Sequence, residues 1–320
     1  MPPVLVTLLT ALHSVFGDLD APQGQLLSFI ELFAGDESIS KGLRLLEYWG
    51  KSYDLRKNTN HDFLSPQGFL AAMLSVLRCH RGAVCWSAPP CSTWVWLSRH
   101  STGRSPDNIY GNLNSHYVCS QNALVTRLSL LLQLCNLRGV FYIIEQPHST
   151  IMWQHPDLKR VLEDKQHPVF RVHMDLGAWS LDNQKPTTLV GTAPWLPQLE
   201  RRMTPTERLA LQLNDARVET AVKYEDKRGI KRCQGTSALK STQSYSMNFG
   251  SAHALAFHKF VVDNKVDKGQ QGLLIDLQEV AKMAVPFDLP GSFDDIITGQ
   301  HDKWHNNKSG EDKLALKALA

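Results

Sequence analysis

Two segments of the chain carry residues that could perform covalent chemistry. The segment "VCWSAPPCSTWVW" (84–96) places Cys91 directly after two prolines, and "VFYIIEQP" (140–147) runs through five apolar residues into Glu145. A cysteine thiolate is a strong nucleophile, and a following helix can lower the pKa of the thiol. A carboxyl group beside buried surface can hold or donate a proton. The pair favours nucleophilic catalysis assisted by a carboxyl group, although most cysteines are inert core residues and Cys91 could be one of them.

Two earlier segments indicate a cofactor site. "SFIELFAG" ends at Gly35, and the strand expected within "GKSYDL" ends at Asp54. A glycine lets a cofactor approach the backbone, and an acidic residue after the second strand can bind a ribose diol. The phosphate-binding pattern G-x-G-x-x-G is missing, and Asp36 and Glu37 would repel a pyrophosphate. Acidic residues favour a cationic cofactor, S-adenosylmethionine rather than NAD, although they are also common in a solvated first helical turn.

The elements that must position these residues alternate between apolar runs and helical patterns. This alternation predicts an α/β fold, a doubly wound, mostly parallel sheet of the Rossmann-like type, in which ligands bind beyond the carboxyl ends of the strands. A capping box, Thr204 with Glu207, starts the last of the expected helices. The expected strands are 28–35, 50–54, 82–89, 140–147, 167–177 and 185–192, and the expected helices are 38–49, 65–80, 120–139 and 204–213.

The chain divides by composition into three parts. We expect an N-terminal extension (1–27) that forms an amphipathic helix rather than a signal peptide, a catalytic domain (28–262) and a polar, partly helical C-terminal tail (263–320). No apolar run is long enough for a membrane span. The six cysteines form no C-x-x-C pair, which indicates a reduced, intracellular chain without structural metal. A net charge of +3 permits a polyanionic partner, and residues 223–240 are predicted to form a basic loop.

Taken in order, these motifs resemble those of the cytosine-C5 DNA methyltransferase family. "LFAG" (32–35), "APPC" (88–91) and "EQP" (145–147) resemble its first glycine turn, its Pro-Cys loop and its Glu-Asn-Val strand end. "RRMTPTERLALQ" (201–212) is similar to its Arg-x-Leu-Thr-Pro-x-Glu helix start, and "MNFGSAHALA" (247–256) to its late Gly-Asn-Ala turn. The resemblance spans residues 28–262, and it implies a methyltransferase of the S-adenosylmethionine-dependent fold.

The resemblance also implies roles for individual residues. Cys91 would add to C6 of a flipped cytosine, Glu145 would hold or protonate N3, and Lys185 is the lone cation where the family has two arginines. The activated C5 would then take the methyl group. Asp62 would meet the adenine of the cofactor, although it also reads as an N-terminal cap of the next helix. The residues implied around S-adenosylmethionine are Phe33, Ala34, Gly35, Asp54, Asp62, Pro89 and Ser251.

The chain departs from the family pattern at several positions. Glu37, Gln146 and Ser251 replace a glycine and two asparagines, and only "TAPWLPQLE" separates Gly191 from Arg201, where the family has its target-recognition region. Contacts that read sequence would then come from the basic loop or from a protein partner, or would not exist. The expected partner is a nucleic acid, DNA ahead of RNA, bound mainly through phosphates. The substrate alone suggests a nuclear location if the protein is eukaryotic.

Two other functions remain open at this stage. An exocyclic-amino methyltransferase would also use two prolines at this strand end, but it needs an aromatic residue directly after them, and Trp94 comes three residues late. A methyltransferase-like domain without activity, kept as a nucleic-acid or protein-binding module, would explain the eroded motifs and the short recognition region.

Overall fold

The computed structural model describes residues 26–180, 183–214 and 219–268. The helix expected near the N-terminus and the helical part expected in the tail, "LLIDLQEVAKMA" (273–284), lie outside the described residues. Two short segments inside the chain, 181–182 and 215–218, are also outside them.

A six-stranded sheet forms the centre of the molecule, in the order β2-β1-β3-β4-β6-β5. The first four strands along the chain are parallel, and β6 runs antiparallel to both of its neighbours. This arrangement confirms the predicted doubly wound, mostly parallel sheet. The strands are β1 (Leu27–Leu32), β2 (Gly50–Tyr53), β3 (Cys79–Ser87), β4 (Phe141–Pro147), β5 (Phe170–Asp175) and β6 (Pro186–Gly191).

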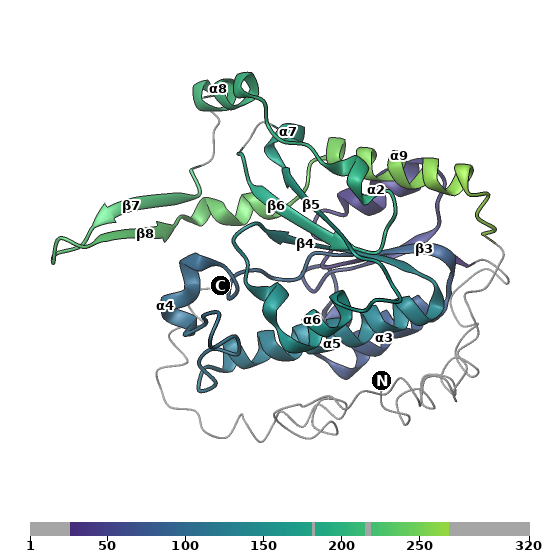
Figure 1. Cartoon of the computed structure of the whole chain (residues 1–320), viewed down its shortest axis with the longest axis horizontal. Coiled ribbons are helices and arrows are strands. Elements are labelled where there is room, and N and C mark those ends of the chain that lie inside the picture. The colour runs from purple at the N-terminus through teal and green to yellow at the C-terminus, as the bar shows by residue number, and fades with distance from the viewer. Residues whose placement is uncertain (1–25, 181–182, 215–218, 269–320) are drawn as a thin grey trace.

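Helices cover both faces of the sheet (Figure 1). On one face lie α3 (Pro66–Leu77), α5 (His116–Arg138) and α6 (Pro156–Leu162). On the other lie α2 (Ser38–Leu45) and α9 (Met247–Asp263), which pack closely against each other. The remaining helices are α4 (Arg99–Thr102), α7 (Gly177–Ser180) and α8 (Pro205–Leu213), with 3-10 turns η1 (Thr59–His61), η2 (Trp96–Ser98), η3 (Met152–Gln154), η4 (Leu196–Leu199) and η5 (Ser237–Gln243).

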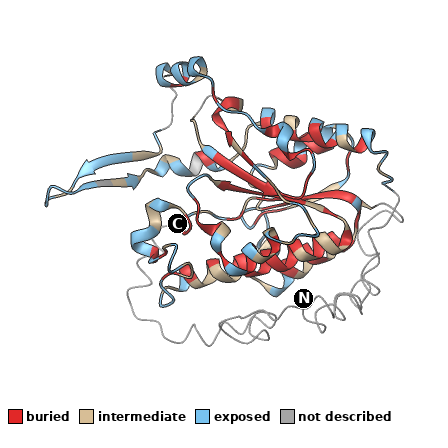
Figure 2. Ribbon diagram, in the orientation of Figure 1, coloured by how far each residue is buried: buried red, intermediate tan, exposed pale blue. Residues whose placement is uncertain are grey.

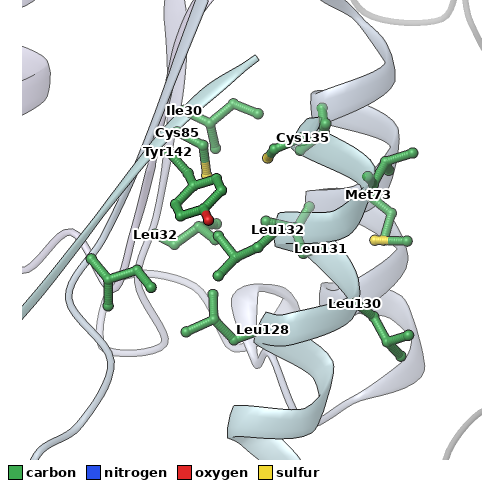
Figure 3. Packing of buried hydrophobic residues seen from close by; sticks show 14 of the residues in the cluster. Ile30, Leu32, Met73, Cys85, Leu128, Leu130, Leu131, Leu132, Cys135 and Tyr142 are labelled. Atoms are coloured by element: carbon green, nitrogen blue, oxygen red, sulfur yellow. The ribbon is translucent and has the colours of Figure 1, made fainter. Parts of the chain in front are cut away.

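The sheet separates two apolar cores. On the α3–α5 face, Leu128, Leu131 and Cys135 of α5 pack over Ile30 and Tyr142 of the strands (Figure 3). The opposite core gathers side chains from α2, α9 and the other face of the same strands. Because side chains alternate along a strand, a residue's place in β1, β3 or β4 decides which core it joins. Burial is concentrated in the sheet and in the inner sides of its helices (Figure 2).

Two predictions about local structure are wrong. The basic segment 223–240 is not a loop: it forms a hairpin of β7 (Ala221–Glu225) and β8 (Lys231–Gly235), followed by η5. The segment around Ser251 is not a turn, because it lies inside α9, which Ser246 caps through a hydrogen bond from the Phe249 amide. The capping box of Thr204 and Glu207 is present at the start of α8, as predicted.

Candidate functional site

The loop that carries Cys91 is held by neighbouring elements. Pro89 is buried, and its carbonyl oxygen accepts a 2.6 Å hydrogen bond from Nε2 of Gln146 at the end of β4. The amide of Trp94 donates to the carbonyl of Cys91 at 2.9 Å, which closes a tight turn. The Trp94 indole is fully buried, with the Arg104 guanidinium 3.5 Å from its ring centroid. The cysteine is therefore placed on an anchored turn, and its side chain is partly exposed.

Glu145 and Lys185 lie close enough to Cys91 to influence the pKa of its thiol. Burial raises the pKa of the Cys91 thiol to about 11; the nearby Glu145 carboxylate raises it further, and the Lys185 ammonium lowers it. The parallel pairing of β3 and β4 explains this proximity, because their carboxyl ends lie side by side. The structure therefore brings together the three residues expected to act on the substrate, with Cys91 as a protonated thiol at neutral pH.

Glu145 faces the α2–α9 side of the sheet and lies next to Tyr245. Its side chain is 6% exposed, and its Oε1 atom has no hydrogen-bond partner within the described part of the chain. The Tyr245 phenol hydrogen bonds to Glu145 and lies 3.4 Å from Nε1 of Trp86 in β3. Burial is the main cause that raises the pKa of this phenol well above its usual range. The phenol thus stays protonated and holds the Glu145 carboxyl group by this hydrogen bond.

Lys185 approaches the same group of residues from the segment before β6. Its backbone φ is +38°, a left-handed conformation that is uncommon outside glycine. The Nζ atom lies 5.6 Å from the centroid of the Tyr245 ring. From this position the ammonium group is near enough to Cys91 to lower the pKa of its thiol, so it can stabilise the thiolate.

The predicted cofactor turn lies at the end of β1 and contacts β2. The amide of Gly35 donates to Oδ2 of Asp54 at 2.8 Å, while the amide and Nε of Arg56 donate to Oδ1 at 2.8 and 3.3 Å. These hydrogen bonds lower the pKa of Asp54 despite its burial, which acts in the opposite direction. A carboxylate has about four lone-pair sites, so one remains for a ribose hydroxyl. The residues fit an adenosine-type cofactor on this count.

Arg56 and Lys57 change the charge that the sequence suggested for this turn. A Cβ on Gly35 would lie 3.0 Å from a guanidinium nitrogen of Arg56, so the arginine covers the glycine. Glu37 pairs with Lys57 at 2.6 Å and with Arg44 at 3.0 Å. These contacts outweigh burial, the largest single influence, and lower the pKa of Glu37 to about 2. The charge of Glu37 is therefore neutralised locally, so this residue gives the turn no preference for a cationic cofactor.

The other residues expected near the cofactor are distributed around this turn. Ala34 is buried, and Phe33, at φ +57°, packs edge-on against the Phe63 ring. Asp62 accepts a 2.9 Å hydrogen bond from the Leu64 amide, and the cap of α3 is Ser65 rather than Asp62. Ser251 lies in α9. Gly250, the residue before it, packs against the start of α2.

Sequence reasoning missed Glu31 and Tyr245. Glu31 is fully buried in β1, on the sheet face that it shares with Trp86 of β3 and Glu145 of β4, and its Oε2 accepts from the Ser40 amide at 2.8 Å. Its Oε1 has no partner within the described residues, and burial raises the pKa of Glu31 to about 7. A single acidic residue inside the apolar run "SFIELF" was the available signal. Nothing in the sequence marks Tyr245, whose position depends on long-range packing.

The described part of the chain also has a cleft, which lies away from Cys91, Glu145 and Lys185. A cleft of about 460 Å³ lies at the amino ends of β3 and β4, the opposite end of the sheet from Cys91, with Arg81, Asn136 and His167 in its wall. No cluster of three or more metal-ligating side chains is found in the described part of the chain. Within residues 26–180, 183–214 and 219–268, no helix has the length and apolarity to cross a bilayer.

Comparison with known proteins gives a loose structural likeness. The chain resembles the Dnmt2 methyltransferase of S. pombe with a TM-score of 0.31 and 11% identity, over 52% of this chain and 48% of that one. It resembles the Entamoeba histolytica methyltransferase EhMeth with a TM-score of 0.34 and 11% identity, over 56% of this chain and 57% of that one. The chain thus matches about half of each structure's length. No protein-family profile matches it. No curated protein matches it either.

Proposed function

We propose that the chain transfers a methyl group to C5 of cytosine in DNA through a covalent adduct at Cys91. The observation that carries the proposal is the placement of Glu145, at the end of β4, and Lys185, directly before β6, within electrostatic reach of Cys91, which follows the adjacent strand β3. A nucleophile, a carboxyl group and a cation are what addition to a pyrimidine ring requires.

These residues would divide the chemistry between them. The Cys91 thiol passes its proton to the Glu145 carboxylate, and Glu145 donates that proton to N3 of the flipped base as the sulfur forms a bond to C6. Bound S-adenosylmethionine supplies an electrophilic methyl group. Once C5 carries that group, a water molecule accepts the C5 proton, the electrons of the C5–H bond form the C5–C6 double bond, and the C6–sulfur bond breaks, which returns the thiolate. N3 then returns its proton to Glu145, from which the thiolate can recover it. Lys185 stabilises the negative charge that Cys91 bears before addition and after elimination.

The residues that would hold S-adenosylmethionine surround the turn after β1. Gly35 and Asp54 are joined by a hydrogen bond at this turn, and the buried Glu31 offers an unpartnered Oε1 atom. Asp54 keeps a lone pair for a ribose hydroxyl. Arg56 would have to share Asp54 with that hydroxyl, because its guanidinium already contacts the carboxylate.

Covalent trapping tests the proposal. A DNA duplex carrying 5-fluorocytosine cannot lose its C5 substituent, so the adduct accumulates in the presence of S-adenosylmethionine. We expect a stable protein–DNA adduct with the wild type and none with Cys91→Ser. Cys119→Ser is the matched control, because Cys119 is another free, partly exposed cysteine, and its adduct should equal that of the wild type. An adduct that survives Cys91→Ser would overturn the proposal, and methylation that survives it would favour the exocyclic-amino reaction.

One observation favours a second candidate, a binding module without activity. The Cys91 thiol has its pKa raised to about 11, whereas catalytic cysteines usually have a lowered pKa. Titration calorimetry with S-adenosylmethionine separates the two functions. Saturable binding that weakens in Asp54→Ala supports the enzyme. Absence of binding, together with salt-dependent binding of DNA, supports the module.

A further inference from the structure

The β7–β8 hairpin extends away from the body of the molecule and has no core of its own (Figures 1 and 2). In β7 the four residues after Ala221 are all exposed. The apolar side chains of Val222, Tyr224 and Ile230 are 42%, 47% and 47% exposed. An isolated two-stranded hairpin is at best marginally stable in water. A projecting ribbon with uncovered apolar side chains is typical of a surface that binds a partner.

The charge of the hairpin indicates what that partner is. Residues 221–235 contain five basic and two acidic residues, a net +3 that equals the charge of the whole chain. Lys223, Lys227, Arg228 and Lys231 are all exposed. Polyanions are the partners that such a concentration of positive charge attracts.

A well-defined turn fixes the two basic residues at the tip. The Oδ1 atom of Asp226 accepts hydrogen bonds from the amides of Arg228 at 2.9 Å and Ile230 at 3.0 Å. The amide of Gly229, at φ +73°, donates to the carbonyl of Asp226 at 2.9 Å. The acidic side chain is therefore occupied in closing the turn, and the side chains of Lys227 and Arg228 remain exposed.

The base of the hairpin lies beside the loop that carries Cys91. Strand β8 packs next to η2 (Trp96–Ser98), which begins five residues after the cysteine in the sequence. The Trp96 side chain in η2 is 50% exposed. A nucleic acid held by the hairpin would therefore lie next to the Cys91 loop. The hairpin could then supply the DNA contacts that the short segment between Gly191 and Arg201 cannot.

The dimensions of the hairpin favour duplex DNA. Five-residue strands are about 16 Å long and lie about 4.8 Å apart. The major groove of B-DNA is about 12 Å wide and admits a two-stranded ribbon, whereas the deep groove of A-form RNA is too narrow for side chains to read. We propose that the β7–β8 hairpin enters the major groove of duplex DNA, with Lys227 and Arg228 on phosphates. This proposal rests on the proposed function for its choice of DNA as substrate.

Equilibrium binding to a fluorescent DNA duplex tests this role with the full-length chain. Lys227→Gln/Arg228→Gln removes two charges and leaves Asp226 and its turn unchanged. We expect this variant to bind DNA about tenfold more weakly at low salt, with the slope of log K against log salt reduced by about 2. Lys41→Gln/Lys259→Gln removes two exposed charges from α2 and α9, so it should bind as the wild type does.

A duplex RNA of the same sequence is the second arm of the experiment. The wild type should prefer the DNA duplex, and the hairpin variant should lose that preference. Equal binding by the hairpin variant and the wild type would overturn the proposal, as would a wild type that binds both duplexes equally or neither. Covalent trapping on 5-fluorocytosine DNA is a separate measurement. If DNA binding depends on the hairpin but no adduct forms, only the proposed function is contradicted. If the hairpin variant forms as much adduct as the wild type, only the hairpin proposal is contradicted.

Discussion

The Gln146 side chain donates a 2.6 Å hydrogen bond to the carbonyl oxygen of Pro89, and it is fully buried while doing so. Its Oε1 atom accepts from the Thr150 hydroxyl at 3.3 Å. The residue that follows Glu145 therefore holds the loop that carries Cys91, which couples the position of the carboxyl group to that of the thiol. The cytosine-C5 DNA methyltransferase family, which the sequence resembles, has an asparagine at this position. Here the longer side chain of glutamine makes the contact with Pro89.

Replacing Gln146 with alanine should loosen the Cys91 loop. The Pro89 carbonyl would lose its partner in a buried site, so the free energy of unfolding should fall by about 1–3 kcal/mol. Urea unfolding measures this loss, and faster alkylation of Cys91 reports the loosened loop. Thr150→Val is the control for the loop, because it removes the 3.3 Å bond to Gln146 and the 3.2 Å bond from the Met152 amide but keeps the bond to Pro89, so Cys91 should be alkylated at the wild-type rate. Wild-type stability and reactivity in Gln146→Ala would contradict this coupling.

The reactivity of Cys91 should rise with pH beyond the range of an ordinary cysteine. A thiol whose pKa is raised to about 11 is mostly protonated below that value, so alkylation should accelerate about tenfold per pH unit until near pH 11. Glu145→Gln removes a negative charge and should lower the midpoint, whereas Lys185→Gln should raise it. Rates measured on Cys91→Ser are subtracted to remove the other cysteines. A plateau near pH 9 in the wild type would contradict the raised pKa.

Glu31 should make stability depend on pH. Burial raises its pKa in the folded chain from 4.5 to about 7, so between these values the folded state keeps a proton that the unfolded state loses. The free energy of unfolding should therefore fall by about 3 kcal/mol as pH rises through that window. Glu31→Gln should remove this loss, and Glu200→Gln, at an exposed site, should not. Unfolding curves with the same pH dependence in Glu31→Gln and wild type would exclude this role.

The contact of α2 with α9 should be sensitive to a single methyl group. A Cβ on Gly250 would lie 2.0 Å from the carbonyl oxygen of Ser38, and one on Gly42 would lie 2.5 Å from the carbonyl oxygen of Gly250. Gly250→Ala should therefore lower the free energy of unfolding by about 1–3 kcal/mol, as overpacking does. Ser251→Ala, one position further along α9, is the control and should be nearly neutral. Thermal unfolding of the two variants measures the difference, and equal midpoints would contradict the close contact.

The sequence was sufficient for features that depend on neighbouring residues. The strand ending at Glu145 and the capping box at Thr204 follow from local pattern, and both are present. The sequence predicts a basic loop over 223–240 instead of the hairpin at 221–235, because charged residues interrupt the short alternation on either side of the turn of Asp226 and Gly229. The resemblance predicts a turn at Ser251, although Ser246 is a good local signal for a helix start.

Contacts between distant segments could not be predicted. The partner of Gln146 at Pro89 lies 57 residues away, and Tyr245 reaches Trp86 across 159 residues. Arg56 covers Gly35 only once β1 and β2 pair. Such contacts depend on how elements pack, which no single segment encodes. For that reason the sequence alone predicts an acidic turn at Glu37 that favours a cationic cofactor, whereas Lys57 and Arg44 pair with Glu37 in the fold.

The hydrogen bond from the Ser38 hydroxyl to the Tyr245 carbonyl joins positions 207 residues apart, at 2.7 Å. During synthesis on the ribosome, the first strand and helix emerge long before α9, which must cover them. The apolar face around Phe29 and Trp86 therefore stays open to chaperones until the end of the described domain has left the exit tunnel. Truncation before α9 would leave that face exposed for the lifetime of the molecule.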